Sequence, residues 1–251
     1  MSKSVTAGII GSVLGIVATV IGIFWIIQYY TFSSMYQQAM AIQNLFFILY
    51  DYTIVVGLFQ NLALSSALSS FMFVTFILAL LLVLTLILMG VGLYGLGKIE
   101  GKSMGTVSLV FGVIGAILAL ILLLAGAATG GTTHNLTSIY LITHFSDIIG
   151  LTPIWTLAFL VVMGGVPAVN GVFLWLGLIA VGSTLIIFGA TFVNLREGLD
   201  SPGLSVATGV LSIIAGIFLF MGVLAPWLAF IILFVGLIMS ALVFYGSRQM
   251  S

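Results

Sequence analysis

The side chains best suited to chemistry in this sequence are two histidines and two aspartates, all in stretches that separate long apolar runs. His144 and Asp147 are three residues apart, which would place them on one face of a helix. Together with His134 they make a minimal ligand set for a divalent metal. The ligand set makes an outer-face metal-binding subunit one of three functional alternatives. Its spacing matches no established metal motif.

Asp51 and Asp147 point to a second kind of site. They lie in two apolar stretches, 41–59 and 139–164. An ionisable residue at membrane depth is a functional hypothesis by default, and these two acids could face an outer vestibule for a small or lipophilic solute. The alternative is a structural role, since a carboxylate near the membrane interface costs far less than one at the bilayer centre.

Other chemistry has little support in the sequence. It contains no GxxxxGK[ST], HExxH or GxSxG stretch. It has no cysteine, which excludes disulfides and thiolate metal sites. Asn135-Leu136-Thr137 forms a glycosylation sequon with Asn135 as the acceptor. We therefore predict a chain that is not an enzyme and has no cofactor.

Composition places the chain in a membrane. It is 63% hydrophobic and 4% charged, with a mean hydropathy of +1.43. Soluble domains are about 25% charged, and a soluble fold with so few charges would expose an aggregating apolar surface. Five basic and five acidic residues balance, which gives no sign of a nucleic-acid partner. Most of the surface must contact lipid.

Six runs are long and apolar enough to cross a bilayer as helices, which need about 20 residues each. The sequence thus predicts an all-α, polytopic membrane helix bundle. The predicted spans are Val5–Ile27, Phe71–Gly95, Thr106–Ala127, Gly171–Val193, Leu204–Leu224 and Trp227–Tyr245.

The basic residues test this count. With six spans, all five fall on one side of the membrane, and any other count would scatter them. The positive-inside rule makes that side cytoplasmic, so both termini lie inside the cell membrane. The residues that set this topology are Lys3, Lys98, Lys102, Arg196 and Arg248.

Two long excursions, 28–70 and 128–170, lie on the outer side. Counting 41–59 or 139–164 as a full span would break the charge rule. Pro153 and Pro167 would also interrupt a continuous helix. We read these stretches as interfacial or re-entrant helices on the outer rim.

Aromatic residues mark the expected ends of the spans, as in the belts at membrane interfaces. The outer markers are Trp25, Tyr29, Tyr30 and Trp227, and the inner markers are Tyr94 and Tyr245.

The spans also repeat. Ser4–Gly8 matches Ser205–Gly209 at a constant offset, and Gly15 then matches Gly216. The chain resolves into three helix hairpins, near 1–100, 101–200 and 201–251, which form a single membrane domain. They run in the same direction, unlike the inverted repeats of many transporters. Their recurring glycines suit close helix packing within the bundle.

The pattern Phe192-x-x-Leu195-Arg196-Glu197-Gly198 resembles uncharacterised multi-pass membrane proteins of thermoacidophilic archaea. The similarity covers mainly the units of loop and helix, about a third of the chain. It implies a membrane fold and no particular activity.

Three functions follow as hypotheses. The first is a non-enzymatic accessory or scaffold subunit of a larger membrane complex, which predicts apolar, small-residue faces left over for partners or for a second copy. The second is a transporter or pore with an outer vestibule. The third is the metal-binding subunit.

Overall fold

The computed structural model describes residues 3–47, 63–132, 168–199, 201–221 and 226–249, and these residues are helical apart from short turns. A 3-10 turn, η1 (Arg196–Gly198), follows the fourth long helix. The long helices are α1 (Lys3–Phe47), α3 (Ala63–Glu100), α4 (Met104–Thr132), α7 (Ala168–Asn194), α8 (Pro202–Met221) and α9 (Pro226–Gln249).

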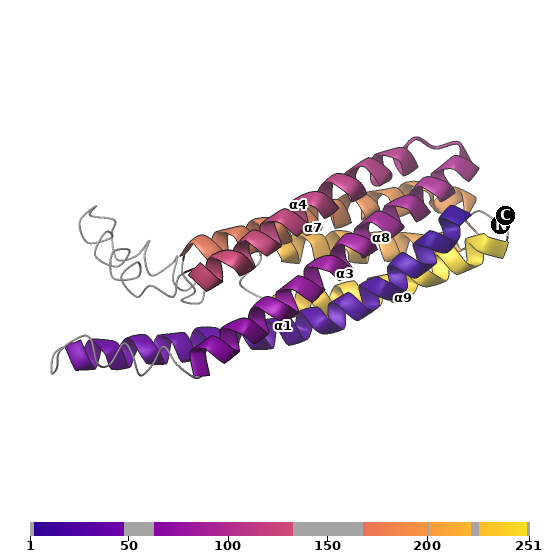
Figure 1. Ribbon diagram of the computed structural model, residues 1–251. Coiled ribbons are helices and arrows are strands. Elements are labelled where there is room, and N and C mark those ends of the chain that lie inside the picture. Colours follow the sequence, from indigo (N-terminus) through magenta and orange to yellow (C-terminus); the bar gives the residue numbers. More distant parts are fainter. Residues whose placement is uncertain (1–2, 48–62, 133–167, 200, 222–225, 250–251) are drawn as a thin grey trace, which may run out of the picture.

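All six long helices are apolar and long enough to cross a membrane, which confirms the predicted all-α bundle. Each packs against the next one along the chain, and α9 closes the ring by packing against α1. Successive helices run in opposite directions, so the two termini meet at one end of the bundle (Figure 1). We call this the terminal end.

Helix α1 extends well beyond its predicted span. The apolar part of α1, Lys3–Gln28, agrees with the prediction, but the helix continues to Phe47. Its 45 residues extend about 68 Å, roughly twice the hydrocarbon thickness of a bilayer. Residues 28–47 contain no glycine or proline to end the helix, so the first excursion begins as a continuation of α1. The excursion segments 48–62 and 133–167 lie outside the described residues.

The contact between α1 and α9 depends on glycines that recur every seven residues. Gly8, Gly15 and Gly22 form a strip along α1. An added Cβ on Gly8 or Gly22 would run into the ring of Phe244 or Phe230, and one on Gly15 would meet Leu237 and Thr85. Each large side chain of α9 therefore fills a notch that a glycine leaves in α1.

Glycines pair directly at the contact between α7 and α8. Gly189 faces Gly209, and Gly182 faces Gly216, so closely that a Cβ on any of them would strike the carbonyl oxygen opposite. Gly97 and Gly105 also pair between α3 and α4, where a Cβ on either one would strike the Cα of the other. These glycines serve the packing of the bundle itself, as the sequence predicted.

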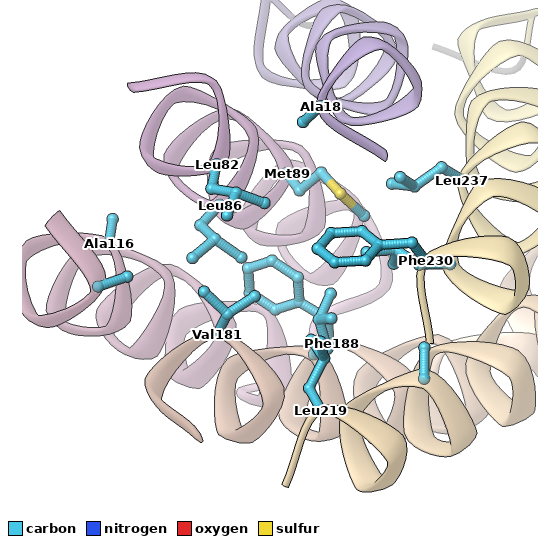
Figure 2. Close-up of a cluster of buried hydrophobic side chains, with 14 of the residues drawn as sticks. Ala18, Leu82, Leu86, Met89, Ala116, Val181, Phe188, Leu219, Phe230 and Leu237 are labelled. Carbon is cyan, nitrogen blue, oxygen red and sulfur yellow. The ribbon is translucent and has the colours of Figure 1, made fainter. Parts of the chain in front are cut away.

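Large side chains fill the middle of the ring. One hydrophobic cluster draws residues from all six long helices, with the rings of Phe188 and Phe230 near its centre (Figure 2). Both phenylalanines and Met89 are at most 1% exposed. α3 and α7 also contact each other across the ring. The bundle is thus packed solid at this level.

Buried hydroxyl groups link neighbouring helices. Ser12 Oγ donates to the carbonyl of Gly8 and lies 3.0 Å from Ser240 Oγ, joining α1 to α9. Ser108 Oγ lies 2.6 Å from Thr191 Oγ1, joining α4 to α7. Such bonds between transmembrane helices contribute about 0.6 kcal/mol on average.

Trp25 differs from its predicted role as an interfacial marker. It lies toward the outer end of its span, but its side chain is only 4% exposed. Its indole Nε1 donates to Thr75 Oγ1 at 2.8 Å, and its ring stacks on Phe71. The polar N–H finds its partner within the protein because α3 supplies a hydroxyl at that depth. By contrast, Trp227 and Tyr245 are about half exposed, as expected for markers.

The close approach of α7 and α8 makes a first prediction. Gly189→Ala should lower the thermal midpoint of the purified protein, by the equivalent of about 1–3 kcal/mol, because the added methyl group must push the helices apart. The matched control is Gly246→Ala in α9, where a Cβ would meet open space. That change should leave the midpoint unchanged or raise it slightly. Equal effects of the two changes would contradict the packing.

Candidate functional site

Every charged residue that the structure describes lies at the terminal end of the bundle. The contacts of Gly8 with Phe244 and of Ser4 with Gly95 bring the ends of α1, α9 and α3 together there. A hydrogen bond from Lys102 to the end of α7 places the α3–α4 turn and the α7–α8 connection at the same end. The residues are Lys3, Lys98, Glu100, Lys102, Arg196, Glu197 and Arg248. Six spans require the five basic residues to share one side, and the structure has this arrangement.

The turn between α3 and α4 positions two of these charges. Gly101 has a positive φ of 68°, a conformation that glycine adopts at little cost. The backbone N–H of Lys102 donates to the carbonyl of Gly97 at 2.8 Å, which is the long bond of a Schellman motif. The motif ends α3 at Glu100 and holds the two side chains on either side of one glycine.

Lys102 joins this turn to the end of α7. Its Nζ donates to the backbone carbonyl of Asn194 at 2.6 Å. A lysine at this position satisfies one of the free carbonyls at the helix C-terminus and opposes the negative end of its dipole. The same Nζ lies 3.4 Å from Glu100 Oε2. At this separation the two groups form an ion pair, but the distance is longer than that of a charge-assisted hydrogen bond.

Glu100 is the most unusual residue of the cluster. Its side chain is only 8% exposed, and neither carboxylate oxygen has a hydrogen-bond partner within the described chain. The carboxyl group lies directly against Gly198 in η1, where any Cβ would overlap it. A carboxylate removed from water in this way is costly unless it is paired and hydrogen-bonded. Glu197, next in η1, is exposed.

This arrangement links two turns and holds charge at their contact. Glu100 and Lys102 belong to the α3–α4 turn, whereas Asn194 and Gly198 belong to the connection from α7 to α8. Within the described ranges, no group of three or more histidine, cysteine or acidic residues could hold a metal. We call Glu100, Lys102, Asn194, Glu197 and Gly198 the turn cluster.

The other predicted site residues lie outside the part of the chain that the structure describes. These are Asp51, His134, Asn135, His144 and Asp147. The metal site, the vestibule and the glycosylation site therefore stay predictions.

Sequence reasoning used Lys102 only as a topology marker and passed over Glu100. A signal was present in Glu100-Gly101-Lys102, where an acid ends an apolar helix next to a glycine and a lysine. The burial of the acid was not visible, because Gly198 lies almost a hundred positions away in the sequence. The chain matches no protein-family model, no curated protein and no solved structure, so its function must be argued from its own residues.

The turn cluster makes a second prediction. Lys102→Met should lower the thermal midpoint in detergent, by the equivalent of about 1–2 kcal/mol, because the end of α7 loses its charged donor. Lys98→Met is the matched control, since Lys98 is an exposed lysine near the end of α3. If neither change lowers the midpoint, the contact between Lys102 and the end of α7 does not stabilise the protein.

Proposed function

We propose that this chain is a non-enzymatic integral membrane protein that acts as an accessory or scaffold subunit of a larger membrane complex. We place it in the cell membrane with the terminal end of the bundle in the cytoplasm. The observation that carries the proposal is the filled centre of the ring.

The filled centre argues against a standing pore. Phe188, Phe230 and Met89 occupy the middle of the bundle, and the charged residues of the described chain lie at one end. The buried polar side chains at intermediate depths are serines and threonines, most of them bonded within their own helix, as Thr184 and Ser212 are. A hydrated path through the described bundle would require these side chains to move.

The outward faces support contacts with lipid and with other apolar spans. Exposed positions along the spans carry large side chains, such as Phe24 on α1, Phe73 on α3 and Ile121 on α4. The small-residue faces expected for partners are not found on the described spans, because most glycines of these spans pack within the bundle. A protein partner would therefore pack against large apolar side chains.

The orientation has its own test. Because the chain lacks cysteine, one introduced cysteine reports its side of the membrane without background. Ser201→Cys, in the exposed turn before α8, should react with an impermeant maleimide only after the membrane is opened. His134→Cys, in the second excursion, should react in intact cells. The reverse pattern would overturn the cytoplasmic assignment.

The subunit proposal is tested by native mass spectrometry of the protein extracted gently from its own membrane. We expect a defined stoichiometric complex with other membrane chains. A lone chain or a homo-oligomer would contradict the proposal and favour transport.

Transport then has its own discriminating experiment. The double change Asp51→Asn and Asp147→Asn should abolish solute flux into vesicles if these acids line a vestibule. Glu197→Gln, an exposed acid at the opposite end, is the control and should leave flux intact. Metal analysis of the same sample tests the third alternative, with His134, His144 and Asp147 as ligands.

A further inference from the structure

The Glu100 carboxyl group is buried in a way that needs an explanation. Both oxygens are covered by protein atoms, and neither accepts a hydrogen bond in the described chain. Buried carboxylates in proteins are normally paired and hydrogen-bonded, because an unpaired buried charge is costly. The covered oxygens are closed off from solvent, and the cation that the structure places beside them, Lys102 Nζ, lies 3.4 Å from Oε2.

The surrounding charges only partly compensate. Lys102 Nζ lies 3.4 Å from Oε2 but makes its short bond to the carbonyl of Asn194. Glu197 in η1 adds a second negative charge close enough to act on Glu100. Glu100 also ends α3, where the helix dipole disfavours an anion. Lys98 on α3 and Arg196 on η1 point into solvent, and Asp200 lies outside the described residues.

The covered oxygens leave no surface for a ligand. Each has under 1 Å² of exposed surface, and the carboxyl group is pressed against the backbone of Gly198. A metal ion or an organic cation would need contact area on these atoms. A proton needs none, since it adds to an oxygen within the existing packing.

We infer that Glu100 is a proton-binding site that makes the contact between the α3–α4 turn and the α7–η1 connection sensitive to pH. When the carboxylate takes up a proton, its charge disappears and the attraction to Lys102 is lost. Lys102 then stays on the carbonyl of Asn194 alone. When the proton leaves, the buried anion draws Lys102 toward itself and away from α7. This inference does not depend on the subunit proposal.

The sign of the effect follows from linkage. If the folded state holds a proton on Glu100 that the unfolded chain releases, folding takes up a proton. Stability then falls as pH rises through the range where a free glutamate ionises, from about 4 upward. An ion-paired, charged Glu100 would produce the opposite slope.

The experiment compares the full-length protein with Glu100→Gln in lipid nanodiscs. Thermal midpoints are measured across a pH series, and infrared spectra of the same samples report protonated carboxyl groups. We expect the midpoint of the wild type, relative to Glu100→Gln, to fall by about 2–4 °C with rising pH. Above about pH 6, where exposed carboxyl groups are ionised, a protonated-carboxyl band should be stronger in the wild type than in the variant.

Two further variants separate the site from its surroundings. Glu197→Gln removes an exposed acid of the same cluster, so the infrared band should remain but should fade at a lower pH than in the wild type. Lys102→Met removes the cation that competes with the proton, so the band should persist to higher pH. A wild-type midpoint that rises or stays level with pH relative to Glu100→Gln, or a band unaffected by Glu100→Gln, would overturn the inference. A variant that fails to fold is recognised because it shows no thermal transition. If Glu100→Gln fails to fold, the shift of the infrared band in Lys102→Met tests the inference.

Discussion

Close approach of helix backbones is the constraint on which this structure depends. Between helices in lipid there is no hydrophobic driving force, because the acyl chains are as apolar as leucine. Association rests on van der Waals contact and on hydrogen bonds, which require backbones to come near each other. Gly8, Gly15 and Gly22 on α1 and the pair of Gly189 with Gly209 allow that approach. Residue size at these positions, more than hydrophobicity, decides whether the ring can close.

Glycines spaced seven residues apart lie where the predicted hairpin units meet, whereas other glycines, such as Gly92 against α1 and Gly115 against α7, line contacts within the units. α3 meets α4 at the boundary between 1–100 and 101–200, and α7 meets α8 at the boundary between 101–200 and 201–251. The third such contact joins α9 to α1 and closes the ring. All three place glycines seven residues apart against a neighbour, which is the spacing that keeps one face of a helix on its partner. The repeat itself stays a prediction, and this placement is the structural feature that most favours it.

The features set by local sequence were predictable, and those set by distant contacts were not. Six apolar runs and five basic residues were enough to predict the spans and the shared end of Lys3, Lys98 and Lys102. The extension of α1 to Phe47 was missed because hydropathy marks where the apolar run stops, whereas a helix stops only where its backbone is interrupted. The burial of Trp25 depends on Thr75 and Phe71 of another helix, and no pattern within α1 announces it.

The same reasoning explains why the candidate site lay hidden. Glu100 looks like an ordinary loop acid until Gly198, from a turn far along the chain, covers it. Glycine at that position gives the carboxyl group its space, just as glycines elsewhere give neighbouring helices theirs. Because the bundle centre is filled by Phe188 and Phe230, changes of charge at the terminal end cannot reach the far end through a hydrated path in the described structure. Any coupling between the two ends would have to pass through movement of the packed helices themselves.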